Sequence, residues 1–175
     1  IVGYVGRFVK EKGIDILIKA ISKIQNCRLI LVSKGDYEKE LKKLTSYLKM
    51  EDRVYFFTKV VHKELKSYYN SFDVFVLPSE TISQWKEQYG RVLVEAMACG
   101  LPVVGSSSGA IGEVIKGYPK ALIFREGDVD DLVEKIKEVK KLEFPENFNL
   151  DDFLYKFSVK NFVKEHIVFY KKLLK

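Results

Sequence analysis

The 175-residue sequence contains only two cysteines, Cys27 and Cys99, and two histidines, His62 and His166. Both cysteines lie in apolar stretches without a CxxC pair or a Cys/His cluster, which favours buried free thiols and argues against a zinc site. Neither histidine has a serine or cysteine partner at a spacing typical of a catalytic pair. No apolar run approaches the roughly 18 residues that a membrane-spanning helix needs, and we recognise no signal segment. The sequence therefore predicts a cytoplasmic domain.

Acidic residues are outnumbered, since 30 Lys and Arg against 24 Asp and Glu give a net charge of +6. A basic excess can indicate nucleic-acid binding. Here most lysines alternate with acids, as in residues 36–43 and 130–138, so we expect a solvated surface rich in ion pairs and no nucleic-acid partner. The last helical stretch is more one-sided. Two interpretations therefore stay open, an acceptor close to a membrane and a peripheral position of the protein at the inner membrane surface. The lysines of this stretch are Lys156, Lys160, Lys164, Lys171, Lys172 and Lys175.

Short apolar runs bounded by turn residues predict six strands, at residues 1–5, 28–33, 53–57, 73–77, 102–105 and 121–124. The segments between them have helical periodicity, most clearly in one apolar stripe formed by Ile14, Leu17, Ile18, Ile21 and Ile24. Because the strands are continuously apolar, we expect a parallel sheet covered by helices on both faces. The predicted fold class is α/β, a Rossmann-like doubly wound parallel sheet whose ligands bind beyond the carboxyl ends of the strands.

The pattern changes after residue 141. Residues 142–147 are typical of a connector, and two helices are expected at about 150–156 and 159–173. We therefore divide the chain into a Rossmann-like domain, residues 1–141, and C-terminal helices that complete it, residues 142–175. The sequence also opens on an apolar run typical of a buried strand, without an initiator methionine, which indicates a fragment of a longer protein.

Two glutamates stand eight residues apart in residues 87–104, which read EQYGRVLVEAMACGLPVV. A helix can start at Gly90, and the Gly-Leu-Pro sequence beginning at Gly100 ends it before a short buried strand. Glu95 is then inside the helix and Glu87 lies ahead of it. If the whole interval were helical, about 1.5 Å of rise per residue would separate the two by about 12 Å. That separation suits contacts with two parts of one long polar ligand better than the sharing of a proton across a scissile bond.

A second polar segment follows the first predicted strand, in residues 3–13, which read GYVGRFVKEKG. Arg7 offers a planar fork of donors and Lys12 a compact positive charge, and both suit a diphosphate. Gly6 and Gly13 let the backbone approach closely, and a helix that starts near Gly13 adds its positive N-terminus. A strand-to-helix turn with two solvated cations is the alternative interpretation of this segment.

Together these segments resemble a known family. Residues 87–104 look like the E-x-F-G…EAMA-x-G-x-PVV block, with E-x7-E spacing, of the retaining, nucleotide-sugar-dependent enzymes of glycosyltransferase family 4. Residues 3–13 resemble that family's G-R-x4-K-G segment, and residues 72–79 its A-D-x-F-x-x-P-S segment. The resemblance runs from end to end over the C-terminal, donor-binding half of a two-domain GT-B enzyme. It implies that residues 1–141 bind a nucleotide sugar and that a missing N-terminal domain supplies the acceptor site and packs on the last helices.

The resemblance also implies the reaction: transfer of a sugar from a nucleoside diphosphate sugar to an acceptor hydroxyl, with retention at the anomeric carbon and without a metal or other cofactor. Arg7 and Lys12 would neutralise the leaving diphosphate, which is electrostatic stabilisation of the transition state. Glu87 would accept a hydrogen bond from the transferred sugar, and Glu95 from the ribose hydroxyls. The remaining donor contacts would come from Gly6, Tyr89, Gly90 and Arg91.

The sequence departs from the family pattern at several loop positions, which leaves the base open: Ser33, Thr58, Tyr89 and Ala110 replace the usual residues. Two other function classes stay open. A stand-alone nucleotide-binding or sensing module would share Arg7, Lys12 and Glu95 but would have no use for Glu87. Separately, Glu87 lies next to Trp85 and Lys86 and could be a surface acid of a loop. A nucleic-acid or interaction domain could use the basic charge, but no groove-reading motif supports it.

Overall fold

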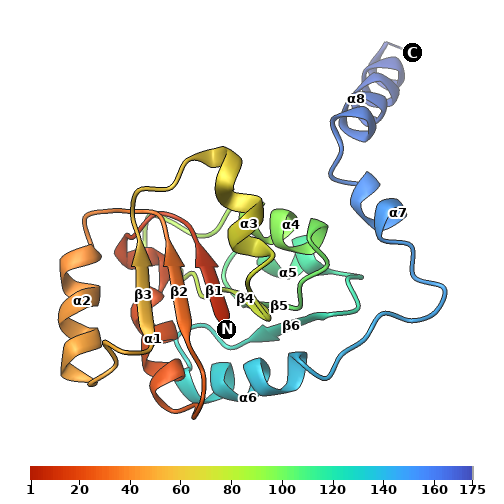
Figure 1. The fold of residues 1–175 in the computed structure, drawn as a ribbon. Helices are drawn as coiled ribbons and strands as arrows, with labels where there is room; N and C mark the ends of the chain where they lie inside the picture. Colours follow the sequence, from red (N-terminus) through yellow and green to blue (C-terminus); the bar gives the residue numbers. More distant parts are fainter. Residues whose placement is uncertain (175) are drawn as a thin grey trace. The chain divides into compact units, whose positions relative to one another are not determined.

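A computed structural model describes residues 1–174 (Figure 1). The chain divides into two compact units, residues 1–143 and a second unit that begins at Phe144. The first unit contains a six-stranded sheet with helices on both faces, and the second contains two helices.

The sheet is parallel throughout, in the order β3-β2-β1-β4-β5-β6. Strands β1, β4 and β5 bury all four of their residues, whereas the edge strands β3 and β6 are partly exposed. Continuous apolar runs therefore form the centre of the sheet, as a strand covered on both faces requires. The predicted doubly wound parallel sheet is confirmed. The strands are β1 Val2–Val5, β2 Leu29–Val32, β3 Val54–Phe57, β4 Val74–Leu77, β5 Val103–Ser106 and β6 Ala121–Phe124.

The helices of the first unit are α1 Ile14–Ser22, α2 Glu38–Tyr47, α3 Leu65–Tyr69, α4 Arg91–Ala98, α5 Ile111–Ile115 and α6 Val129–Val139. Right-handed crossovers place α1 and α2 on one face of the sheet, where α6 also packs against α1, and place α4 and α5 on the other. Helix α1 buries the predicted apolar stripe except for Ile24, which lies beyond the end of the helix and is half-buried.

Strand order reverses between β1 and β4, which are neighbours in the sheet although β2 and β3 come between them in sequence. Chain connections leave β1 and β4 in opposite directions, and α/β sheets bind their ligands in the crevice beyond the carboxyl ends of such strands. The two loops that border this crevice are residues 6–13, after β1, and residues 78–90, after β4. They contain the two motifs found in the sequence.

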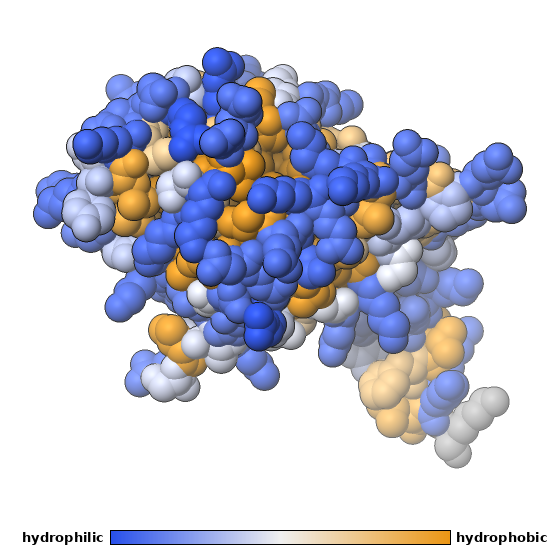
Figure 2. Space-filling model, turned by 90° about the horizontal axis from the view of Figure 1, so that it is seen from below, coloured by the Kyte–Doolittle hydropathy of each residue, from blue (hydrophilic) through white to orange (hydrophobic). Residues whose placement is uncertain are grey.

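One face of the first unit is mostly hydrophilic (Figure 2). Figure 2 views the molecule from below and shows charged and polar side chains surrounding smaller apolar patches. Ion pairs join neighbouring helix positions, as in Lys42–Glu38 at 2.6 Å and Lys135–Glu138 at 2.8 Å. This pattern is the interleaved charge expected from the sequence.

The second unit contains α7, Leu150–Tyr155, and α8, Val159–Leu173. Each begins at a residue whose side chain accepts hydrogen bonds from first-turn amides, Asn149 for α7 and Ser158 for α8. Helix α8 buries none of its side chains. Across residues 1–174, no helix combines the length and apolar character needed to cross a bilayer.

Candidate functional site

The loop after β1 packs directly on the end of β4. Residues Lys10–Lys12 form a 3-10 turn that ends at Gly13, whose backbone is left-handed with φ of 61°. A Cβ atom on Gly13 would lie 2.0 Å from the carbonyl oxygen of Pro78, a distance that no side chain could occupy. The amide of Glu80 also donates to the carbonyl of Glu11 at 2.8 Å. Glycine therefore allows the close approach that brings Lys12 to the loop after β4.

Lys12 and Glu87 form an ion pair although 75 residues separate them in sequence. Lys12 Nζ lies 2.5 Å from Glu87 Oε2, and Ser79 Oγ donates to the same oxygen at 2.8 Å. Glu87 is 7% exposed and Ser79 is fully buried. The interpretation of Glu87 as a surface acid of a loop is therefore wrong. Burying a carboxylate costs free energy unless a charge and hydrogen bonds compensate it, and Lys12 and Ser79 supply both.

Trp85 also contacts Lys12, whose ammonium lies over the indole ring, 4.7 Å from its centre. The loop turns back on itself here, because Ile82 and Trp85 exchange backbone hydrogen bonds at 2.8 and 3.1 Å. A cation placed over an indole face is attracted by the ring quadrupole. Lys12 is thus held by a carboxylate and by an aromatic ring.

Arg7 is exposed and makes no ion pair with any residue from 1 to 174. The Tyr4 hydroxyl donates to the Arg7 carbonyl at 3.1 Å. Burial raises the pKa of Tyr4 well above its usual range; the negative charge of Glu87 raises it further and the positive charge of Arg7 opposes the rise. Tyr4 therefore lies within the electrostatic reach of both groups. Gly6, with φ of 155°, covers this tyrosine, and a Cβ there would lie 2.8 Å from Tyr4 Oη.

The loop after β5 also contacts the segment that contains Glu87. A Cβ on Gly109, whose φ is 54°, would lie 2.0 Å from the Glu87 carbonyl oxygen, which accepts a hydrogen bond from the amide of Ala110 at 2.9 Å. Ser106 Oγ donates to the Ser79 carbonyl at 2.5 Å, and Ser108 Oγ lies 2.9 Å from Thr81 Oγ1. Ser106 is the last residue of β5 and is buried.

Helix α4 starts at this cluster. Gly90 precedes it with a left-handed φ of 68°, and no side chain caps its first amides. Tyr89 and Arg91 flank Gly90 and are both exposed. An uncapped helix N-terminus beside the Glu87 side chain offers backbone donors and a positive dipole end to an anion.

Glu95 lies one turn into α4, half-buried in a cavity of about 300 Å³ lined by residues of α3 and α4. Tyr69 Oη, at the end of α3, donates to Glu95 Oε2 at 2.7 Å. Burial, and then this hydrogen bond, raise the pKa of Tyr69 well above its usual range, so the phenol remains a protonated donor. The cavity lining also includes the basic or titratable side chains of His62, Lys63 and Lys66.

The structure thus brings Lys12 and Glu87 together beyond the carboxyl ends of β1 and β4, whereas Glu95 lies further along α4 in a separate cavity beside α3. Three partners were not predicted: Ser79, Thr81 and Tyr69. A usable signal existed for Ser79, which is the first polar residue after the continuously apolar strand β4. No comparable pattern marks Tyr69, because its contact with Glu95 depends on the packing of α3 against α4.

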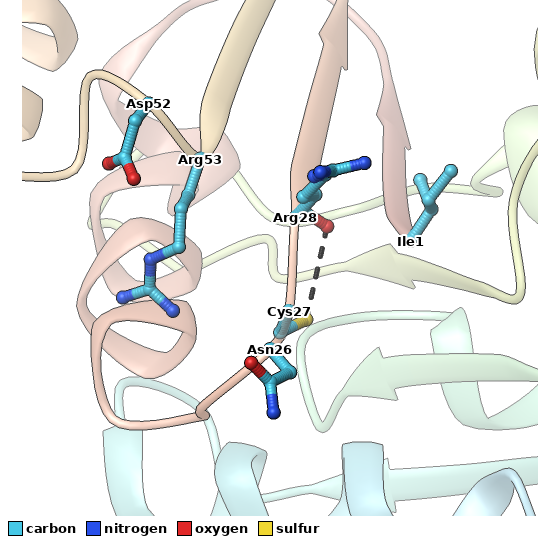
Figure 3. A pocket seen from close by; sticks show the side chains of 6 residues that line it. All are labelled: Ile1, Asn26, Cys27, Arg28, Asp52 and Arg53. Carbon is cyan, nitrogen blue, oxygen red and sulfur yellow. Dashed lines mark hydrogen bonds between the residues drawn. The ribbon is translucent and has the colours of Figure 1, made fainter.

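A further cavity, of about 380 Å³, lies at the opposite edge of the sheet (Figure 3). It is lined by residues that precede or begin β1, β2 and β3, and the Cys27 thiol there donates only to the Arg28 carbonyl, at 3.8 Å. Arg53 turns away to donate to the Ile24 carbonyl at 2.8 Å. Because ligands of such sheets bind beyond the carboxyl ends of the strands, we place the candidate site at the other edge.

Several known proteins are similar to this chain in sequence and fold. The chain is 34% identical to an uncharacterized glycosyltransferase of Methanocaldococcus jannaschii, over 96% of this chain and 44% of that protein. The structure of sucrose-phosphate synthase from Thermosynechococcus elongatus matches with a TM-score of 0.80 at 27% identity, over 99% of this chain and 45% of the synthase. The structure of HepE from Anabaena in complex with UDP-glucose matches with a TM-score of 0.71 at 29% identity, over 80% of this chain and 38% of HepE.

The chain therefore spans less than half the length of these relatives. The sequence model of one family, described as Glycosyl transferases group 1, matches residues 1–152, which include the whole sheet and both glutamates. The chain belongs to the glycosyl transferases group 1 family, and its sheet and helices have the fold of GT-B glycosyltransferases.

Proposed function

We propose that this chain binds a nucleoside diphosphate sugar and is the donor-binding half of a retaining glycosyltransferase. The observation that carries the proposal is the ion pair of Lys12 and Glu87 beyond the carboxyl ends of β1 and β4, with Arg7 in the same loop as Lys12 and Glu95 in the cavity between α3 and α4. The relative HepE, solved with UDP-glucose, supports a nucleotide sugar as the ligand.

Each residue has a role that follows from its surroundings. Arg7 and Lys12, with the uncapped start of α4, bind the diphosphate and stabilise the charge that it gains on leaving. Lys12 exchanges its partner Glu87 for the phosphate oxygens, which frees that carboxylate to accept a hydrogen bond from the sugar. Glu95 accepts hydrogen bonds from the ribose hydroxyls inside the cavity. Two cations and a helix dipole supply the positive charge, so we propose that no divalent metal is required.

The first test is binding. A thermal-shift panel of UDP, GDP and ADP with their sugar conjugates identifies the base, since a ligand at a hundredfold its dissociation constant stabilises the folded chain by about 2.7 kcal/mol. We expect one nucleoside diphosphate to stabilise the chain equally with and without a chelator. If none of them does, the proposed function is wrong.

The second test separates the phosphate contacts from the rest. In calorimetry, Arg7→Ala and Lys12→Ala should each weaken binding of the nucleoside diphosphate by about 1.5–3 kcal/mol and leave binding of the nucleoside almost unchanged. Lys34→Ala, which removes an exposed lysine after β2, is the matched control. Equal losses for both ligands would contradict the assignment of Arg7 and Lys12 to the diphosphate.

The third test concerns transfer. The acceptor site and the outcome at the anomeric carbon belong to the whole enzyme, so retention is checked there by NMR of the anomeric proton of the first product. Glu87→Gln should weaken binding of the nucleotide sugar by this chain but not that of the nucleotide. A chain that binds both ligands equally well, before and after this substitution, would instead be a nucleotide-binding or sensing module.

A further inference from the structure

Two hydroxyl groups each bind one oxygen of a glutamate at the candidate site. Ser79 Oγ donates to Glu87 Oε2 at 2.8 Å, and Tyr69 Oη donates to Glu95 Oε2 at 2.7 Å. Within residues 1–174, the Oε1 atom of neither glutamate accepts a hydrogen bond. No buried side-chain oxygen in that range lacks a partner, so Oε1 of Glu87 reaches the surface although the residue is 7% exposed. Each carboxylate therefore has one anchored oxygen and one open oxygen.

Both hydroxyl donors are themselves held by the fold. The Tyr69 ring is buried and packs against Phe72 and Phe75, with ring centres 6.1 and 5.7 Å away. Ser79 is fully buried at the end of β4, and its carbonyl accepts a hydrogen bond from Ser106 at 2.5 Å. A donor on a rigid element restricts the rotation of the carboxylate it binds, so the open oxygen points in a fixed direction before a ligand arrives.

We propose that Tyr69 and Ser79 are positioning residues, which orient Glu95 and Glu87 so that the open oxygen of each faces the bound donor. The inference rests on the proposed function and deepens it. Tyr69 acts on the ribose through Glu95, and Ser79 acts on the sugar through Glu87. Ser79 matters most once a diphosphate is bound, because Lys12 then turns to the phosphates and Ser79 remains as the described partner of the Glu87 carboxylate.

The test uses the whole 175-residue chain and calorimetry with UDP, 2′-deoxy-UDP and UDP-glucose, or the corresponding GDP set if GDP is the stronger ligand in the panel. We expect Tyr69→Phe to weaken the binding of UDP about threefold to tenfold and that of 2′-deoxy-UDP less than twofold, because the removed hydroxyl acts only through the ribose contact. We expect Ser79→Ala to remove most of the affinity that glucose adds to UDP and to leave UDP itself within twofold.

Matched controls delete buried hydroxyls that lie away from the site. Tyr118→Phe removes a phenol that donates to the Leu101 carbonyl at 3.0 Å, and Thr45→Val removes a hydroxyl that donates to the Leu41 carbonyl at 2.8 Å. Neither substitution should change the ratio of the UDP affinity to the 2′-deoxy-UDP affinity, or of the UDP-glucose affinity to the UDP affinity. Thermal melting of each variant, followed by circular dichroism, shows that it is folded at the temperature of the titrations.

A double-mutant cycle gives the decisive result. In the Glu95→Ala background, Tyr69→Phe should have no further effect on UDP affinity, since the residue through which it acts is gone. An effect that persists there, or equal losses for UDP and 2′-deoxy-UDP, would overturn the role of Tyr69. If Ser79→Ala leaves the glucose increment intact, the role of Ser79 is overturned. A chain that binds none of these nucleotides would contradict the proposed function, and the inference with it.

Discussion

Glu87 and Glu95 are eight residues apart in sequence, but their carboxylates are compensated in different ways. Glu87 is buried between three loops, and its negative charge is compensated by Lys12 from the loop after β1. Glu95 lies on a helix beside a cavity, where the Tyr69 phenol and solvent are sufficient to compensate its carboxylate. The first arrangement depends on distant parts of the chain and the second on two adjacent helices, so substitutions at the two sites should differ in size.

The largest expected effect comes from the glycine that allows the Glu87 site to form. Gly13→Ala would place a methyl group 2.0 Å from the Pro78 carbonyl oxygen on a left-handed backbone, so we expect at least about 3 kcal/mol of lost stability in urea unfolding. Gly112→Ala is the control, because it adds a methyl group to open space within helix α5 and should gain up to about 1 kcal/mol. Similar losses for both variants would show that the contact with Pro78 is not what requires glycine.

This first prediction also shows where sequence reasoning succeeds and stops. The strands were placed to within a residue or two because central strands of a parallel sheet are short, continuously apolar runs between turns. The contact between Lys12 and Glu87 could not be derived from local pattern alone, since it requires β1 and β4 to be neighbours. The predicted doubly wound sheet places ligands beyond the carboxyl ends of its strands but does not give the strand order.

Residues whose role depends on packing were missed. Tyr69 reaches Glu95 only because of where α3 ends, and no spacing rule relates the two residues. Ser33 was noted as a departure from a family glycine, but its backbone was not predicted to have φ of 128°, a conformation rare for residues other than glycine. Its amide nevertheless donates to the Phe57 carbonyl at 3.0 Å, so the neighbouring strand holds it in that conformation.

The second prediction compares two lysines. Lys12→Met leaves Glu87 buried without its positive partner, and we expect a loss of about 2–4 kcal/mol in urea unfolding at pH 7. Lys19→Met removes the half-buried partner of Asp15 at 2.9 Å, one turn along helix α1, and should cost at most about 0.5 kcal/mol. If the two substitutions lower the free energy of unfolding equally, the Lys12–Glu87 pair is as well solvated as an ordinary surface pair, and the two glutamate sites do not differ as argued.

The third prediction measures the Glu95 site in the same assay. Tyr69→Phe removes one hydrogen bond but keeps the buried ring, so we expect a loss of about 1 kcal/mol. Water in the adjacent cavity can replace the lost donor, which limits the cost. A loss as large as that of Lys12→Met would mean that Glu95 depends on Tyr69 as strongly as Glu87 depends on Lys12.

The smallest expected effect concerns Trp85, which contacts the same ammonium as Glu87. The cation over the indole face should contribute about 0.5–1 kcal/mol, because Lys12 is largely but not fully buried. A double-mutant cycle of Trp85→Leu and Lys12→Met, measured by urea unfolding with circular dichroism, isolates that coupling from the packing of the indole. A coupling near zero would show that Glu87 alone fixes the ammonium. A coupling above about 1 kcal/mol would show that residues 82–85 contribute to the charge compensation of Glu87, so that the loop after β4 supports this site through Trp85 as well as through Ser79.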